Sequence, residues 1–273
     1  MTERRHMMRL DVAVVRGKLA RSRDQAKDVI VSGRVQVDGR TVTKPARRVQ
    51  DSAEISRTDG VEQWVGRAAH KLLAALDRWT PVGLVVTQCR CIDIGASTGG
   101  FTQVLLSHGA ASVLSIDVGT RQLVASLAAD PRVTDVSGTH VLSLSGEDVG
   151  PADLIVMDVS FISAATVLEH VAPWCQMGGS LVVLVKPQFE VGRQAVGSGG
   201  VVHSASSRVA AVQHVMATAY RGGLALRGVM RSPITGRGGN IEYLLWLSPA
   251  VPGMMDQPAA FALAENLEQE GRR

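Results

Sequence analysis

The sequence has 273 residues, of which 45% are hydrophobic and 20% are charged, and its formal net charge is +4. This composition excludes a disordered or fibrous chain and leaves room for one full α/β domain and a smaller one. No apolar stretch approaches the ~20 residues of a membrane span, and no apolar signal segment opens the chain. Three cysteines without metal-binding spacing suit a reducing compartment, so we expect a cytoplasmic protein without a metal or a membrane partner.

Positive charge is concentrated in residues 1–48. They hold thirteen arginines and lysines against five acids, a net charge of about +8, so the rest of the chain is slightly acidic. A basic segment joined to a near-neutral one suggests that the first part binds a polyanion. Charge alone is also compatible with an ordinary solvated surface.

The basic segment predicts two short helices and a hairpin. Apolar residues follow a helical period over 9–20, and a second helix begins after Ser22 and ends at Gly33. The next residues alternate around an Asp38-Gly39 turn, which indicates a β-hairpin. With its stretches RLD, ARSRDQA, VQVDG and TKP, this segment resembles the small RNA-binding domain of the ribosomal-protein S-four type. The resemblance implies binding to structured RNA, mainly through its backbone, by Arg9, Arg21, Arg23, Lys27 and Lys44.

Four segments follow from these patterns. Residues 1–49 are the expected RNA-binding domain, and the polar residues 50–65 are the expected linker. A second domain covers 66–250, and the tail 251–273 predicts a turn and a short helix that docks on the sheet.

The second domain contains a glycine-rich turn in the stretch CRCIDIGASTGGFTQVLLSHGAASVLSID, residues 89–117. Strands are expected at 91–94 and 112–116, with a helix at 101–108 between them, and Asp117 lies about twenty residues past the turn, where a ribose would bind. The turn lacks the second glycine of the G-x-G-x-x-G motif that places a helix N-terminus against a pyrophosphate. We therefore favour S-adenosylmethionine over a dinucleotide, which remains the alternative.

The same stretch resembles the S-adenosylmethionine loop of class I methyltransferases. That resemblance implies a cofactor site formed by Asp93, Gly95, Ala96, Ser97, Thr98, Gly99, Gly100, Phe101, Asp117, Val118, His140 and Asp158. Further strands are expected at 153–163, 180–190 and 240–248, with helices at 164–174 and 208–221 between them. This alternation predicts a doubly wound, Rossmann-like α/β domain, which follows the small α+β domain along the chain.

Four charged residues stand out in the second domain. Asp158, Lys186 and Glu242 lie at comparable ends of the three apolar runs, and Lys71 lies near the start of the domain. A lysine after five consecutive apolar residues has a hydration cost that folding alone does not require. The four residues together predict a site rather than isolated surface charges, although a structural salt-bridge cluster is the alternative.

A Lys–Asp–Lys–Glu tetrad on this fold resembles the ribose 2′-hydroxyl methyltransferases. The stretches DVSFIS, LVKPQFEVG and SPITGRGGNIEYLLWL resemble the TlyA (haemolysin A) family, whose members join an RNA-binding domain to an FtsJ-like methyltransferase domain. The resemblance implies binding to ribosomal RNA or ribosomal subunits and methylation of a cytidine 2′-hydroxyl. It assigns the catalytic roles to Lys71, Asp158, Lys186 and Glu242. Separately from the resemblance, we expect a monomer.

The residue types fit that chemistry. A ribose hydroxyl is a poor nucleophile until its proton is removed, and a buried lysine beside a second cation loses its own proton more readily than an exposed one. We expect Lys186 to be the base and Lys71 to orient the hydroxyl. Asp158 and Glu242 would hold the two ammonium groups in place.

Departures from the family pattern surround the expected cofactor site. Thr120 and Arg121 replace a usual Tyr-Gly, and Ser137–Leu142 replaces a different motif. These changes suggest an altered cofactor affinity or a specialised paralogue whose substrate need not be the ribosome. Three alternative functions stay open: methylation of a hydroxyl on a small metabolite, an RNA-binding protein without cofactor, and a membrane-active cytolysin, the activity behind the older family name. The basic N-terminal segment argues against a small metabolite, which would not need it. The intact glycine-rich turn argues against a protein without cofactor. The absence of a long basic amphipathic helix argues against a cytolysin.

Overall fold

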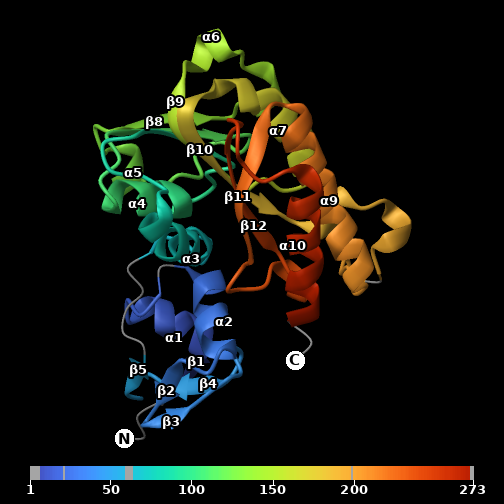
Figure 1. The fold of residues 1–273 in the computed structure, drawn as a ribbon. Helices are drawn as coiled ribbons and strands as arrows, with labels where there is room; N and C mark the ends of the chain where they lie inside the picture. Colours follow the sequence, from blue (N-terminus) through green and yellow to red (C-terminus); the bar gives the residue numbers. More distant parts are fainter. Residues whose placement is uncertain (1–6, 21, 59–63, 198, 271–273) are drawn as a thin grey trace, which may run out of the picture. The chain divides into compact units, whose positions relative to one another are not determined.

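The structure, a computed structural model, describes residues 7–20, 22–58, 64–197 and 199–270. Its chain forms two compact units, residues 1–67 and 68–273, drawn in Figure 1. The first unit is small and α+β, and the second is a large α/β unit.

The first unit contains the predicted helices and hairpin. The Ser22 hydroxyl accepts a hydrogen bond from the Gln25 amide at 3.2 Å and caps the second helix. Asp38 and Gly39 both adopt positive φ, of 50° and 75°, which is the geometry of a tight hairpin turn. The elements are β1 (Met7–Arg9), α1 (Leu10–Arg16), α2 (Arg23–Val31), β2 (Val35–Val37), β3 (Arg40–Thr41), β4 (Arg48–Gln50) and β5 (Ile55–Arg57).

The first unit extends further along the chain than the polar composition of 50–65 indicates. Strand β5 pairs antiparallel with β2, and β4 pairs antiparallel with β1. Part of the expected linker therefore completes the small sheets of this unit. The pairing of β5 depends on an edge of β2 that is some twenty residues earlier in the sequence, so local composition does not reveal it.

The second unit is built on a seven-stranded sheet with the order β11-β12-β10-β9-β6-β7-β8. Strands β8, β7, β6, β9 and β10 run parallel, and β12 is antiparallel to both of its neighbours. The doubly wound, Rossmann-like fold is as expected. The strands are β6 (Arg90–Ile94), β7 (Ser112–Asp117), β8 (Val133–Ser137), β9 (Ala152–Met157), β10 (Cys175–Val185), β11 (Leu224–Arg231) and β12 (Tyr243–Pro249).

Helices cover both faces of this sheet. Helices α7, α9 and α10 pack against one another and on β10 and β11, whereas α4 packs on β6 and β7 and contacts α3. Figure 1 shows the two groups on opposite sides of the sheet. The helices are α3 (Ala69–Trp79), α4 (Gly100–Ser107), α5 (Ala125–Ala128), α6 (Gly146–Val149), α7 (Ala164–Val171), α8 (Pro187–Glu190), α9 (Ala205–Arg221) and α10 (Gln257–Glu270).

Two strands end earlier than expected, and the difference concerns the candidate catalytic residues. Strand β10 ends at Val185 rather than near residue 190, because Pro187 begins the short helix α8. Strand β9 likewise ends at Met157. Asp158 and Lys186 therefore lie directly after their strands, at the carboxyl edge of the sheet.

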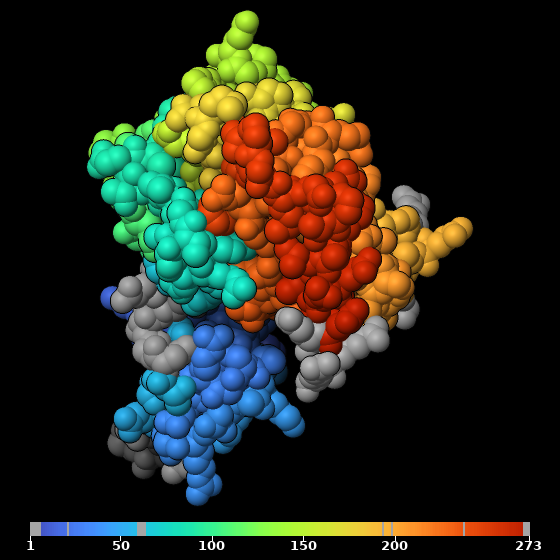
Figure 2. All heavy atoms as spheres, viewed as in Figure 1, coloured from blue at the N-terminus to red at the C-terminus, as the bar shows by residue number. Residues whose placement is uncertain are grey.

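The tail forms the helix α10, which Figure 2 shows in red on the surface of the second unit. Its buried Glu268 forms ion pairs with Arg208 of α9 at 2.5 Å and with Arg231 of β11 at 2.8 Å. Glu268 also accepts a hydrogen bond from the hydroxyl of Tyr243. Burial alone would raise the pKa of Glu268, but the bonds from Arg208, Tyr243 and Arg231 lower it to about 2.

We expect Glu268→Ala to lower the free energy of unfolding by about 3 kcal/mol, because it leaves the buried Arg208 without its carboxylate. The matched control is Glu265→Ala, one turn away on α10, whose exposed bond to Gln213 should be worth less than about 0.5 kcal/mol. Urea denaturation measures both variants, and equal effects would contradict the prediction. Since the folded-state pKa is depressed, the contribution of Glu268 should disappear as the pH falls from about 4.5 to 2.

Candidate active site

The four candidate catalytic side chains meet in one ionic cluster, called the tetrad below: Lys71, Asp158, Lys186 and Glu242. The Lys186 ammonium lies 2.6 Å from Oδ1 of Asp158, and the Lys71 ammonium lies 3.5 Å from Oδ2 of the same carboxylate. Lys71 is also 2.7 Å from Oε2 of Glu242. Asp158 therefore bridges the two lysines, and two carboxylates balance two cations.

The fold explains why these residues meet. Asp158 follows β9 and Lys186 follows β10, and these parallel neighbours end at the same edge of the sheet. Glu242 precedes β12, whose antiparallel direction brings its start to that edge, and Lys71 comes from α3. All four side chains are at most 12% exposed, so each charge depends on its partners.

Lys186 has a second partner that the sequence did not indicate. Its ammonium donates a hydrogen bond to the hydroxyl of Ser160 at 2.6 Å. The carboxylate of Glu190, at the end of α8, accepts bonds from the Ser163 hydroxyl and the Ala164 amide, each at 2.6 Å. These bonds tie the segment after Lys186 to the start of α7. The stretches DVSFIS and KPQFE contain the residues of both pairs. The sequence therefore contained the residues, and only the structure shows which of them are bonded to each other.

Glu242 is held against a glycine loop. A Cβ atom on Gly236 would lie 2.2 Å from Oε1 of Glu242, so no larger residue fits there without moving the carboxylate. The Asn240 side chain accepts a bond from the Val202 amide at 3.0 Å and donates one to the Gly200 carbonyl at 2.8 Å. The loop before Glu242 is therefore joined to the glycine-rich loop before α9.

The expected cofactor residues surround the point where the strand order reverses. Strand β6 lies between β7 and β9, and the turn after it, residues 95–99, lies where such folds bind ligands. Asp117, at the end of β7, accepts hydrogen bonds from the Ser97 amide at 2.8 Å and the Gly119 amide at 2.7 Å. These bonds hold the turn next to the acid expected at a ribose.

Two features of this turn fit a bound S-adenosylmethionine. Gly95 has a φ of +83°, and a Cβ on it would lie 2.5 Å from the carbonyl oxygen of Asp158, so the turn packs directly on the backbone that follows β9. Asp93 is fully buried and bonded to the Thr102 hydroxyl at 2.7 Å. Its other oxygen, Oδ1, has no hydrogen-bond partner among the described residues and is available to a donor on a ligand.

Burial raises the pKa of Asp93 to about 7, and the bond from Thr102 opposes this shift. The folded protein therefore binds a proton between about pH 4 and pH 7 that the unfolded chain has released. The contribution of Asp93 to stability is full below pH 4 and is lost as the pH rises to 7. We expect Asp93→Asn to remove a decline of roughly 3 kcal/mol in the unfolding free energy between pH 5 and 8. Denaturation in urea at both pH values tests this, and an unchanged decline would refute it.

The departures from the family pattern lie around the end of β7. The Gly138 amide donates to the Gly119 carbonyl at 3.1 Å, and the Thr139 amide donates to the Asp117 carbonyl at 3.0 Å. His140 is exposed, and its Nδ1 accepts a bond from the Leu142 amide at 3.2 Å. The segments 119–121 and 137–142 are therefore adjacent around Asp117. Val118, beside it, is 69% exposed.

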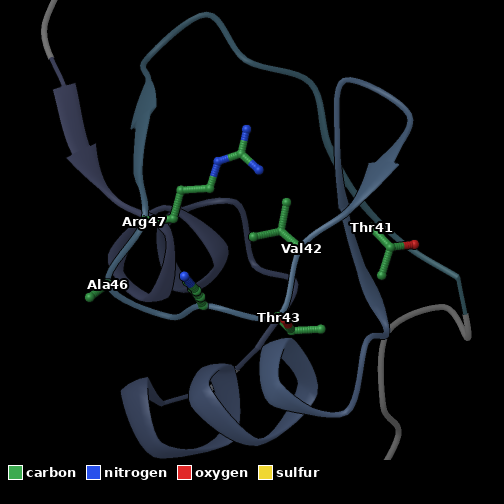
Figure 3. Close-up of a pocket in the computed structure, with 6 residues that line it drawn as sticks. Thr41, Val42, Thr43, Ala46 and Arg47 are labelled. Atoms are coloured by element: carbon green, nitrogen blue, oxygen red, sulfur yellow. The ribbon is translucent and has the colours of Figure 1, made fainter.

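Three of the five expected RNA-binding residues form ion pairs. Arg9 and Arg23 both bond the carboxylate of Asp11, and Lys27 pairs with Asp24 at 2.9 Å. Lys44 lines a depression at residues 41–47, where Figure 3 shows Val42 and Arg47 on the inner side of the curved loop. Arg21 lies outside the described residues.

An exposed aromatic residue beside the tetrad was not predicted. Phe161 follows Ser160, is 88% exposed and adopts a φ of +64°, a strained conformation for a phenylalanine. Its ring lies 5.4 Å from the ring of Phe189. The only sequence signal was its place in DVSFIS, because solvent exposure and backbone strain are properties of the folded chain.

The described residues contain no group of three His, Cys, Asp or Glu side chains that could hold a metal ion. In the same part of the chain, no helix is both long and apolar enough to cross a membrane. The glycine turn lies at the strand-order reversal, an acid ends the next strand, and the tetrad lies at the adjoining ends of β9, β10 and β12. This arrangement is that of an S-adenosylmethionine-dependent methyltransferase.

Comparison with known proteins agrees with this class. The profile of the FtsJ-like methyltransferases matches residues 64–248, and that of the S4 domain matches residues 8–55. The chain is 46% identical over 241 residues to the 16S/23S rRNA (cytidine-2'-O)-methyltransferase TlyA of Mycobacterium tuberculosis. The match covers 88% of this chain and 89% of that protein. It is 37% identical to Hemolysin A of Brachyspira hyodysenteriae, over 87% of this chain and 98% of that protein.

A solved structure is also similar over the full length. A candidate hemolysin from Streptococcus thermophilus has a TM-score of 0.72 at 34% identity, covering 98% of this chain and 99% of that chain. This protein therefore belongs to the TlyA family of FtsJ-like methyltransferases with an N-terminal S4 domain.

Proposed function

We propose that this protein transfers a methyl group from S-adenosylmethionine to the ribose 2′-hydroxyl of a cytidine in ribosomal RNA. The tetrad is the observation that carries the proposal, because it places two lysines and two carboxylates beside the expected cofactor turn. We also propose that the protein acts as a monomer in the cytoplasm, on ribosomal subunits or on their RNA.

In this proposal Lys186 first releases its ammonium proton to water and then, as a neutral amine, accepts the proton of the 2′-hydroxyl. Its ammonium contacts one carboxylate and one hydroxyl, and if it loses its proton, Asp158 still has Lys71 as a cationic partner. Glu242 keeps Lys71 in position, since its carboxylate contacts Lys71 at 2.7 Å and is itself confined by Gly236. The bound cofactor supplies the electrophilic methyl group. The protein contributes orientation and a route for the proton.

Phe161 fits the substrate side of the proposed site. Apart from its contact with the ring of Phe189, the Phe161 ring is open to solvent, and its backbone is strained. Aromatic side chains commonly stack on unpaired RNA bases. Phe161 directly follows Ser160, which bonds the proposed base Lys186. We therefore propose that the target nucleotide stacks on Phe161 while its ribose faces Lys186.

Methyl transfer to purified ribosomal subunits tests this function. The protein is incubated with each subunit and methyl-labelled S-adenosylmethionine, and the RNA is digested to nucleosides for mass spectrometry. Labelled 2′-O-methylcytidine supports the proposal, and the subunit that yields it identifies the substrate. Absence of label in both subunits, with cofactor binding intact, would reject an RNA substrate and direct the search to small hydroxylated molecules.

A further inference from the structure

An acidic residue lies inside the basic N-terminal unit. The carboxylate of Asp11, on the first turn of α1, has no exposed surface. Its Oδ1 accepts bonds from Nε of Arg9 at 3.0 Å and from the amide of Val12 at 3.0 Å. Its Oδ2 accepts bonds from Nη2 of Arg9 at 3.1 Å and from Nη2 of Arg23 at 2.9 Å. Each carboxylate oxygen therefore has two donors.

These bonds fix two guanidinium groups next to each other, which we call the arginine pair: Arg9 and Arg23. Because both Nη2 atoms bond the same oxygen, they lie within about 6 Å of each other. The arginines themselves stay open to solvent, with side chains 46% and 56% exposed. Two adjacent cations would repel without the carboxylate between them.

The arginine pair keeps unused hydrogen-bond donors. Arg9 donates from its Nε and Nη2 to Asp11, and Arg23 donates from its Nη2, so neither Nη1 group has a partner among the described residues. Bonds from Arg9 and Arg23 hold the pKa of Asp11 well below its usual range despite burial. The carboxylate thus remains ionised, and the arginines remain oriented, throughout the neutral pH range.

We propose that the arginine pair is a preorganised binding site for one RNA phosphate, and that Asp11 is the positioning residue that makes it so. A phosphate oxygen can accept charge-assisted bonds from each guanidinium, and their fixed orientation lowers the entropy lost on binding. The proposal deepens the proposed function, on which it rests for its ligand. It predicts that an acidic residue strengthens binding to a polyanion. Net charge alone predicts the opposite, because an acid lowers the positive charge of the unit.

Binding of the full-length protein to a labelled ribosomal RNA transcript tests this inference. Asp11→Asn adds one positive charge yet should weaken RNA binding about five- to tenfold, because the arginine pair loses its orientation. The matched control Asp51→Asn removes the exposed carboxylate that pairs with Arg16 at 2.7 Å, with the same change in charge. It should leave binding unchanged or slightly tighter. Tighter binding by both variants would overturn the proposal.

A second pair of variants tests the inference even if Asp11→Asn does not fold. Arg23→Gln leaves the Arg9–Asp11 ion pair in place, and Arg16→Gln makes the same charge change at the control pair. The Arg23 variant should lose more affinity and show a shallower salt dependence than the Arg16 variant. Equal losses would overturn the proposal. No methyl donor is present, so this inference and the proposed methyl transfer can fail separately.

Discussion

Lys186→Ala should reduce methyl transfer to ribosomal RNA by about 10²- to 10⁴-fold, the usual range for removing a general base. The fold should persist, because Asp158 retains its ion pair with Lys71 and the rest of the tetrad is unchanged. Label transferred from S-adenosylmethionine to subunits measures the rate, and thermal unfolding measures the fold. A rate within threefold of the unaltered protein would exclude Lys186 as the base.

Two further variants separate the functions of Lys186. Lys186→Arg keeps a cation that can pair with Asp158, but arginine does not lose its proton in proteins, so transfer should remain as low as in the alanine variant. Recovery of the rate by arginine would instead assign Lys186 an electrostatic role. Ser160→Ala removes only the hydroxyl that accepts the bond from Lys186, and we expect a smaller loss in rate.

Gly95→Ala should abolish cofactor binding and reduce the free energy of unfolding by about 2–5 kcal/mol. An added Cβ would lie 2.5 Å from the Asp158 carbonyl oxygen, and the φ of +83° is itself unfavourable for alanine. Calorimetric titration with S-adenosylmethionine gives the affinity, and urea denaturation gives the stability.

Gly223→Ala is the matched control for Gly95→Ala. Gly223 has a φ of +75°, but nothing lies within 4 Å of an added Cβ, so it isolates the backbone cost of about 1–2 kcal/mol. Cofactor affinity should be unchanged in this control. If both variants lose the same stability and Gly95→Ala still binds the cofactor, the close approach of Gly95 to Asp158 has no functional importance.

Local patterns alone predicted much of this protein. The Ser22 cap, the Asp38-Gly39 turn and the strand–glycine turn–helix unit after residue 90 all depend on neighbours within a few residues. Buried parallel strands are continuous apolar runs, which explains why the Rossmann-like class was evident. The strand-like run before Lys186 ends with a charge, and this discontinuity was enough to mark a candidate site.

The tertiary structure alone decided how those residues work together. Whether Asp158 bridges both lysines depends on the order and direction of β9, β10 and β12, which are far apart in the sequence. The Ser160 partner, the exposure of Phe161 and the pairing of Asp11 with Arg23 are also non-local, whereas Arg9 is only two residues from Asp11. Local sequence determines which conformation a segment prefers, whereas ion pairing and exposure are set by segments that meet only when the chain folds.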